Sequence, residues 1–425
     1  MPKANGRTAQ SAGELDQTFA HSGLQTLRFP AARQTIGKSL AVLPSGKIIV
    51  STTVIDASGA SFYGLARLLA DGHLDTRFGQ DGYLRGQFVS GRLSQGGNLV
   101  LDASGAFWMC AMLADESGKP QQIIARFNAD GTPDTEFGDG QSGYRIVPMR
   151  LPELYNSAGG HLILAQSTPA IPTPDRLIFV TSQKGSGLLT RLFLDGKDDS
   201  GFADNGWIPL TLARVAITLH GVRQLSDGQI LVHGKTEGTN QGLVFAYDCS
   251  GKVAKSFGKD GTLLLSLHNA GVPLDSSVNS IVAQSAQRLL LIGSAVESSA
   301  GEKHQHGLIS AITREGGADP AFNGGEPVIT AARQPLDLKS WSAGFALDDF
   351  PGPRIVTVGQ TSEGERRLLT GGFLVDGAVD PEFDVEGAAG IEWIAQDACL
   401  QGSSVLVLGH KNEAAHLVRL LTTAS

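Results

Sequence analysis

The sequence predicts an all-β fold, a seven-bladed β-propeller with four antiparallel strands per blade, closed by the N-terminal strand completing the last blade. Three observations support this prediction. A turn motif recurs seven times at intervals of 55 to 65 residues. Short strand patterns flank each copy, and the partial copies at the two ends of the chain add up to one whole repeat.

The motif is clearest in DGHLDTRFGQDGYL at residues 71–84, and it returns as SGKVAKSFGKDGTL at 250–263. Each copy has a phenylalanine, with a glycine six residues before it and, in all copies but one, an aspartate three residues before it; Ala254 stands at the exception. The phenylalanines are Phe19, Phe78, Phe137, Phe202, Phe257, Phe322 and Phe383. The glycines are Gly13, Gly72, Gly131, Gly196, Gly251, Gly316 and Gly377, and the aspartates are Asp16, Asp75, Asp134, Asp199, Asp319 and Asp380.

Each recurring position of the repeat has a physical explanation. Glycine adopts a positive φ without steric cost, so the D-G and S-G steps indicate tight turns. The aspartate can accept hydrogen bonds from nearby backbone N–H groups, and the phenylalanine is the apolar anchor that packs a repeat on its neighbour. The spacing of Asp71 and Asp75 also suggests calcium, but no further carboxylate follows at ligand spacing, so turn formation is the preferred interpretation.

Strand patterns surround the motif in a constant order. Residues 39–55 indicate two strands around a P-S-G turn, residues 62–72 a third strand and residues 82–88 a fourth. The same order returns at 221–234, 242–251 and 261–267. The chain ends on a third-strand pattern, AAHLVRLLTTAS, and begins with the turn and fourth strand, so residues 24–29 are predicted to complete the last blade. We therefore expect a flexible tail at 1–10 and one propeller domain at 11–422.

The phrase DG-x-x-D-x-x-F-G-x-x-G resembles the bacterial delta-60 repeat family. The best matches are ARLLADGHLDTRFGQDGYL and ARFNADGTPDTEFGDG, and the weaker copies extend the resemblance over residues 11–422. This resemblance implies a β-propeller. It implies no general activity and no catalytic residues.

Composition narrows the possible partners. Hydrophobic residues make up 41% and charged residues 18% of the chain, and the net charge is -8. Without a cluster of Lys and Arg, nucleic-acid binding is not expected, and no apolar run is long enough for a membrane span. The polar start MPKANGRTAQSAG predicts a soluble protein that is cytoplasmic or exported without a classical signal peptide. We expect a monomer, and we interpret Cys110, Cys249 and Cys399 as reduced strand residues.

The loops suggest where a ligand would bind. Turns that join strands one to two and three to four are short and repetitive, whereas the between-blade loops and strand two-to-three loops, such as 297–307, are long and irregular. Five between-blade loops carry an arginine 11 to 14 residues after the phenylalanine: Arg33, Arg92, Arg150, Arg214 and Arg333. A ring of arginines near the channel mouth predicts binding of a carboxylate, a phosphate or an acidic segment. The alternative is that each arginine pairs locally or covers a loop.

Other candidate residues point to chemistry less strongly. His304 and His306, with Glu302, have the spacing of metal ligands, but a solvated loop is the preferred interpretation. His233 lies in ILVHG, where other repeats have IIVST, LLLIG and IVTVG, and it is interpreted as a core histidine. No metal or other cofactor is expected, and G-x-S-x-G, P-loop, GxGxxG and HExxH motifs do not occur.

The sequence leaves two functions open. The preferred one is a non-enzymatic binding module that presents a site for a protein, a peptide, an anionic small molecule or a glycan on the irregular-loop face. The alternative is a hydrolase or lyase with a site at the channel mouth and an anionic substrate, because propeller enzymes collect one residue per blade and leave no linear motif. The fold alone does not decide between them.

Overall fold

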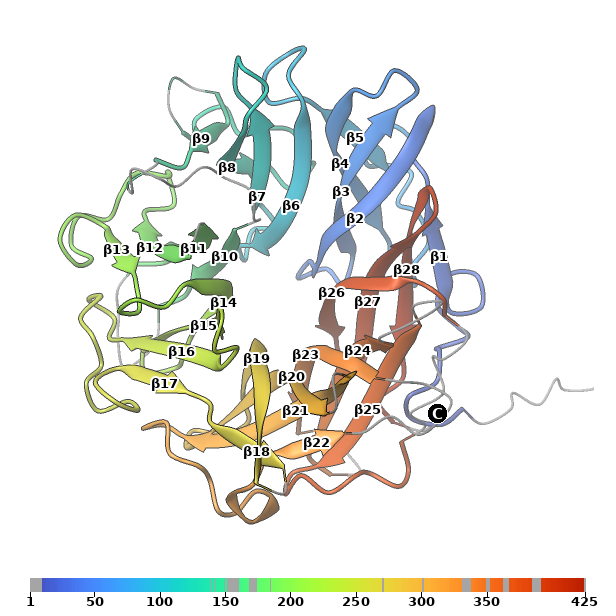
Figure 1. Cartoon of the computed structure of the whole chain (residues 1–425). Coiled ribbons are helices and arrows are strands. Elements are labelled where there is room, and N and C mark those ends of the chain that lie inside the picture. Colours follow the sequence, from blue (N-terminus) through green and yellow to red (C-terminus); the bar gives the residue numbers. More distant parts are fainter. Residues whose placement is uncertain are drawn as a thin grey trace, which may run out of the picture.

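The computed structural model is a seven-bladed β-propeller whose sheets are arranged around a central axis (Figure 1). It describes residues 10–423 except 139, 141, 149, 151–159, 168–173, 184, 270, 300–301, 331–337, 349–351, 362–366 and 384–390. The fold predicted from the repeats is confirmed.

The blades follow one another along the chain, and the first strand of each blade is its innermost strand. Blade five is the exception, because one short strand precedes its innermost strand. Blade one has β2 (Ala32–Val42), β3 (Ile48–Asp56), β4 (Ser61–Leu68) and β5 (Tyr83–Gly86), and blade two has β6 (Ser94–Leu101), β7 (Phe107–Ala114), β8 (Pro120–Phe127) and β9 (Tyr144–Ile146). Blade three has β10 (His161–Ala165), β11 (Arg176–Gln183), β12 (Ser186–Leu192) and β13 (Trp207–Leu210), and blade four has β14 (Ile217–Gln224), β15 (Ile230–Thr236), β16 (Gly242–Tyr247) and β17 (Thr262–Leu264). Blade five has β18 (Leu267–Asn269), β19 (Val272–Ala283), β20 (Arg288–Ser299), β21 (Glu302–Thr313) and β22 (Val328–Thr330), blade six has β23 (Leu338–Leu347), β24 (Arg354–Thr361) and β25 (Leu368–Leu374), and blade seven has β26 (Ile394–Gln401), β27 (Ser404–Lys411), β28 (Ala414–Leu420) and β1 (Leu24–Leu27).

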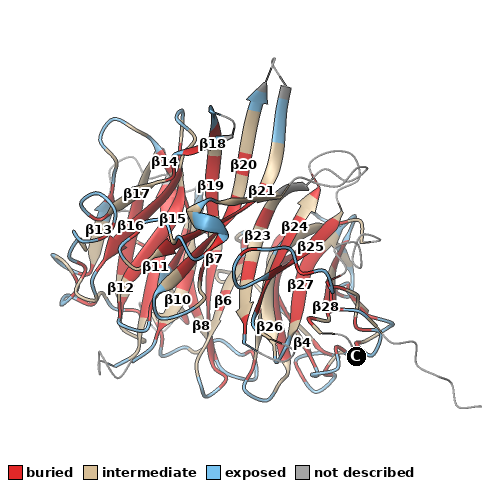
Figure 2. Ribbon diagram, turned by 90° about the horizontal axis from the view of Figure 1, so that it is seen from below, coloured by how far each residue is buried: buried red, intermediate tan, exposed pale blue. Residues whose placement is uncertain are grey.

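Two blades depart from the simple pattern. In blade six, three strands are described, and the position of the expected fourth strand falls among residues 384–390, outside the described residues. In blade five, β20 and β21 pair as far as Ser299 and Glu302 and rise above the rest of the molecule (Figure 2). The prediction of an irregular loop over 297–307 is therefore wrong for most of that segment. A hairpin needs only backbone pairing at its tip, so polar residues there give no alternating hydrophobic signal.

The ring closes as the sequence predicts. Strand β1 pairs antiparallel with β28, with Leu24 opposite Val418 and Leu27 opposite Ala415, so the first and last strands lie side by side (Figure 1). Leu27 and the following Phe29 are buried in a cluster shared by blades one and seven. The N-terminal segment thus covers the edge that β28 would otherwise expose.

The repeated phenylalanine and glycine meet across blade boundaries. Each phenylalanine is buried, and Phe78 reaches the turn of the next blade at Gly131. A Cβ added to Gly131 would lie 2.5 Å from the Phe78 ring, and the φ of Gly131 is +85°. Both the close approach and the backbone conformation therefore require glycine. The same contact occurs between Phe19 and Gly72, Phe137 and Gly196, Phe202 and Gly251, Phe257 and Gly316, and Phe322 and Gly377.

The repeated aspartate is a buried or half-buried ion-pair partner. Asp75 accepts hydrogen bonds from Arg67 Nε at 2.9 Å and Lys47 Nζ at 2.8 Å, while its other oxygen accepts from the backbone N–H of Arg77. The hydrogen bond from Lys47 is the main reason that the pKa of Asp75 lies below its usual value. Every repeat aspartate has an arginine partner: Arg419–Asp16, Arg67–Asp75, Arg126–Asp134, Arg191–Asp199, Arg288–Asp319 and Arg354–Asp380.

Blade four shows why the aspartate column has one exception. The backbone of Ala254 bonds to Ala246, as that of Asp75 bonds to Arg67 and that of Asp199 to Arg191. Ala254 and Ala246 therefore occupy the two positions of the ion pair. The carboxylate and the guanidinium are replaced together, which avoids leaving either charge unpaired in a partly buried position.

Candidate functional site

The innermost strands carry β-bulges near the middle of their length. The register shifts between Gly37 and Ser39 in β2, Gln95 and Asn98 in β6, Leu219 and Gly221 in β14, Val278 and Ser280 in β19, Trp341 and Ala343 in β23, and Ala395 and Asp397 in β26. A bulge inserts an unpaired residue and redirects the side chains beside it. Polar residues follow several of these bulges, and they connect neighbouring blades.

From blade seven to blade three, these polar residues form a chain of hydrogen bonds. Asp397 accepts from Ser39 Oγ at 2.6 Å and from the backbone N–H of Leu40 at 3.0 Å. Ser39 in turn accepts from the N–H of Leu99, and Asn98 accepts from the N–H of Leu162 at 2.7 Å. Burial raises the pKa of Asp397. These bonds fasten consecutive innermost strands to one another.

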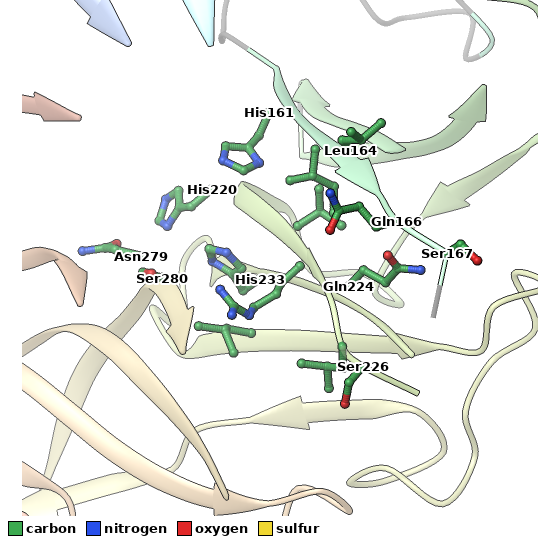
Figure 3. A pocket seen from close by; sticks show the side chains of 15 residues that line it. His161, Leu164, Gln166, Ser167, His220, Gln224, Ser226, His233, Asn279 and Ser280 are labelled. Carbon is green, nitrogen blue, oxygen red and sulfur yellow. The ribbon is translucent and has the colours of Figure 1, made fainter. Parts of the chain in front are cut away.

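At blades three and four, histidines occupy the place of these polar residues beside the central axis. Gly221, after the bulge of β14, pairs with His233 of β15, and a Cβ on Gly221 would lie 2.8 Å from His233 Nε2 and 3.7 Å from His161 Cγ. The missing side chain at Gly221 thus leaves the space that the His233 ring fills. His220, the bulged residue, lies beside them, so three histidines from β10, β14 and β15 gather there (Figure 3).

The hydrogen bonds of two histidines define their tautomers. His220 Nδ1 lies 3.0 Å and His233 Nδ1 3.2 Å from the carbonyl oxygen of Val278 in blade five. A carbonyl oxygen can only accept, so each Nδ1 carries the proton and each neutral ring keeps a lone pair on Nε2. Both histidines therefore fasten blade four to blade five and offer an acceptor nitrogen.

Burial keeps the histidines neutral. It lowers the pKa of His161 to about 4 and that of His233 to about 3, and it also lowers the pKa of His220. His161 Nδ1 is buried without a hydrogen-bond partner among the described residues. Imidazoles with such low pKa values are weak proton acceptors at neutral pH, so they suit hydrogen bonding better than acid–base catalysis.

A cavity of about 510 Å³ lies beside these histidines, between β10, β14 and β19. We call it the histidine cavity, and its lining comprises His161, Ile163, Leu164, Gln166, Ser167, His220, Val222, Arg223, Gln224, Leu225, Ser226, His233, Asn279, Ser280 and Ile281. It extends from the bulges to Ser226 in the turn between β14 and β15 (Figure 3). It therefore faces the repetitive strand one-to-two turns, whereas the loop pattern of the sequence favoured the irregular-loop face.

Arg223 is the only permanently charged residue among the described residues that line the histidine cavity. Its side chain is solvent-accessible, and it forms neither an ion pair nor a hydrogen bond with a described residue. The carboxylate of Asp227 in the adjoining turn is paired with Arg314, and Glu237 is paired with Lys235 at 3.6 Å. The positive charge of Arg223 is thus not neutralised by either group.

The structure places four of the five predicted arginines, and each lies at a different junction between two blades. Arg33 at the start of β2 and Arg214 before β14 are exposed. Arg92 pairs with Glu116 of its own blade at 2.8 Å, and Arg150 pairs with Asp198 and lies 5.6 Å from the ring of Trp207, the first residue of the outermost strand β13. Arg333 lies outside the described residues. Arg92 and Arg150 thus have the local partners of the structural alternative, while anion binding by the five remains a prediction.

The structure also shows where the candidate metal ligands and the cysteines lie. His304 and His306 lie in β21 opposite Glu297 and Ala295, in a strand where a loop was expected. No group of three or more His, Cys, Asp or Glu in the described part of the chain has a geometry that could hold a metal ion. Cys110 is buried and Cys249 and Cys399 are partly buried, and all three are free thiols.

The irregular-loop face has a smaller cavity of about 340 Å³ between blades seven and one. Gln34, Trp393 and His410 are among its lining residues, and the Lys411–Glu392 ion pair, with an Nζ–Oε2 distance of 2.7 Å, also borders it. Both positive and negative side chains line this cavity, so its charge does not select for anions.

A match to a family model supports the fold and leaves the function open. A family described as "Domain of unknown function (DUF5122) beta-propeller" matches residues 43–78 and 113–137. This match supports membership of a β-propeller family, without reaching the finer delta-60 assignment. No curated protein matches the sequence. Within the described residues, no helix has the length and apolar character to cross a membrane.

Solved structures resemble the chain at low identity. Virginiamycin B lyase from Staphylococcus aureus is 12% identical, with a TM-score of 0.44 over 94% of this chain and 99% of that chain. A subtype N11 neuraminidase-like protein of A/flat-faced bat/Peru/033/2010 (H18N11) is 9% identical, with a TM-score of 0.40 over 88% of this chain and 99% of that chain. A protein of unknown function from Dyadobacter fermentans is 11% identical, with a TM-score of 0.41 over 82% of this chain and 98% of that chain. These likenesses carry no functional argument.

Proposed function

We propose that this propeller is a non-enzymatic binding module whose ligand site is the histidine cavity. The observation that carries the proposal is that this cavity, of about 510 Å³, is lined mainly by polar side chains from three blades. A volume of this size fits a small organic ligand, and convergent polar groups on a rigid scaffold are typical of binding sites. The site replaces the irregular-loop face as the first place to look for a ligand.

The polar lining is available to a ligand. The side chains of Gln166, Gln224 and Ser280 form no hydrogen bond with the described residues, although each lines the cavity. By contrast, the Asn279 amide donates to the carbonyl oxygen of Trp341 and is already engaged. Unengaged amides and hydroxyls can exchange water for ligand groups at little cost.

The alternative is a hydrolase or lyase that uses these histidines in proton transfer, a possibility raised by their gathering at one point. The lowered pKa values of His161 and His233 weaken it, because a general base works best with a pKa near the operating pH. Binding is therefore the function that we favour.

Blocking the cavity mouth tests the proposal. Ser226 is exposed in the turn after β14, and Pro44 is the exposed residue at the same turn position in blade one, away from the cavity. We would screen a mixture of small sugars, organic acids, phosphates and amines by saturation-transfer NMR. We expect at least one compound to bind the wild type and Pro44→Trp but not Ser226→Trp. A lack of any binder, or binding that Ser226→Trp leaves unchanged, would contradict the proposal.

A further inference from the structure

We infer that the histidine cavity takes a small anionic ligand that also carries hydroxyl groups, with the carboxylate or phosphate of the ligand held by Arg223. This inference rests on the proposed function, because it names the ligand class for the same site. It follows from three features of the lining: its charge, its unengaged donors and its acceptor nitrogens.

The charge of the lining selects for an anion. Arg223 is the single permanent charge among the described lining residues, and it has no ion-pair partner there. A guanidinium presents a fixed fork of N–H donors that matches a carboxylate or a phosphate. The Arg223 side chain reaches solvent, but partial burial of the guanidinium lowers its pKa, so solvent screens the charge less than it would on an open surface. A partly desolvated, unpaired arginine attracts an anion more strongly than a fully hydrated one does.

The neutral groups around Arg223 select for hydroxyls. Gln166, which follows β10, and Gln224, the last residue of β14, face the cavity from neighbouring blades and offer both donors and acceptors (Figure 3). The Nδ1–H groups of His220 and His233 are directed at the Val278 carbonyl, so the neutral rings have acceptor Nε2 atoms. An acceptor nitrogen needs a donor from the ligand, and a hydroxyl supplies one. A ligand with only oxyanion groups would leave these nitrogens unmatched.

The five arginines of the between-blade loops provide a matched contrast. Arg92 is an arginine of the same chain, half-buried and paired with Glu116, and it does not line the histidine cavity. Arg92→Gln therefore removes the same charge from the protein without touching the site. Because Arg223 is solvent-accessible and unpaired among the described residues, Arg223→Gln should leave the fold intact.

The experiment measures dissociation constants by isothermal titration calorimetry with matched probes. The anionic probes are citrate, gluconate, glucuronate and glucose 6-phosphate, and the neutral probe is glucose. Inorganic phosphate separates an oxyanion alone from a hydroxylated anion. We expect at least one hydroxylated anion to bind the wild type and Arg92→Gln more tightly than glucose or phosphate does. Arg223→Gln should weaken that binding by about tenfold or more, as for a lost charged hydrogen bond, and Arg223→Lys should restore part of it.

Each contrary result overturns a defined part of the reasoning. Equal affinity for glucose and glucuronate, or equal affinity of wild type and Arg223→Gln for the anions, would overturn the anionic class while leaving the binding function in place. Tighter binding of phosphate than of every hydroxylated anion would overturn the requirement for hydroxyls. If none of the anions binds although Ser226→Trp blocks a neutral or cationic compound, the inference fails and the proposed function survives.

Discussion

Replacing Phe78 with alanine should cost about 4 kcal/mol of folding free energy, the middle of the range for buried aromatic residues. Phe78 is 1% exposed and packs against the turn at Gly131 of the next blade. The guanidinium carbon of Arg67 lies over the Phe78 ring, 4.6 Å from the ring centroid. Removing a fully buried phenylalanine costs about 3–5 kcal/mol because apolar transfer energy and close contacts are lost and a cavity remains. Loss of the cation–π contact adds about 0.5–1 kcal/mol.

The assay is equilibrium unfolding in urea, followed by tryptophan fluorescence, with Phe193→Ala as the control. Phe193 is half-buried, and the guanidinium carbon of Arg176 lies 4.4 Å from the centroid of its ring. Phe193 therefore has the same kind of cation–π contact as Phe78 but is not fully buried. The Phe78 variant should lose at least twice as much stability as the control. A loss below about 1 kcal/mol, well under the range for a buried aromatic residue, or a loss no larger than that of Phe193→Ala, would refute the anchor role.

A second pair of variants tests whether the anchor acts across the blade boundary. Gly131→Ala places a Cβ 2.5 Å from the Phe78 ring and imposes a φ of +85° on alanine, so it should destabilise the protein by itself. In Phe78→Ala/Gly131→Ala the steric conflict disappears, so the combined loss should be smaller than the two single losses added together. Strict additivity would mean that the two residues do not share a contact.

Ring closure, the repeat ion pair and the buried histidines can each be tested in the same way. Deletion of residues 1–30 should expose the β28 edge and give an aggregating or markedly less stable protein, whereas deletion of residues 1–9 should be tolerated. Size-exclusion chromatography and thermal unfolding would show the difference. A stable monomer from the longer deletion would contradict the closure. Asp75→Ala should cost about 3 kcal/mol of folding free energy at pH 7, as expected for a broken buried ion pair. Because the pKa of Asp75 is lowered in the folded protein, the stability difference between wild type and variant should shrink as the pH falls below 3.8. A stability difference that stays constant far below that pH would refute this reasoning. Burial lowers the folded pKa of His161 to about 4 and that of His233 to about 3, both below 6.5, so wild-type stability should fall as the pH drops below 6.5. The expected loss is about 2 kcal/mol per histidine by about pH 5. Urea unfolding of His161→Gln/His233→Gln should show a flatter pH profile in that window.

The architecture could be predicted because its signals are local and repeated. Gly72, Asp75 and Phe78 belong to one turn motif whose residues each have a fixed structural task, and seven copies make the pattern unmistakable. The pairing of β20 and β21 beyond the sheet could not be predicted, because backbone hydrogen bonding there requires no particular side chains. Local patterns identify strands only where one face packs against a core.

The histidine cavity could not be predicted in the same way, because its residues come from separate blades. His161, His220 and His233 lie in three strands, and only the bulge at His220 and the space above Gly221 bring the rings together. His233 departs from an apolar column of the repeat, and this departure is the one signal that the sequence contains. Arg223 lies inside a strand and not in a between-blade loop, so the recurrence of loop arginines does not reveal it.

The pairing of β1 with β28 also sets an order on how this protein is made. Leu24 is synthesised before the strands of the six intervening blades and its partner Val418 after them, so β1 must wait for all of those blades before it can pair. Blades one to five can form from neighbouring segments during synthesis, because their strands are consecutive in sequence. The final pairing is therefore a late event that joins distant segments, and a chain interrupted before β28 would keep its first strand unpaired and open to association with other chains.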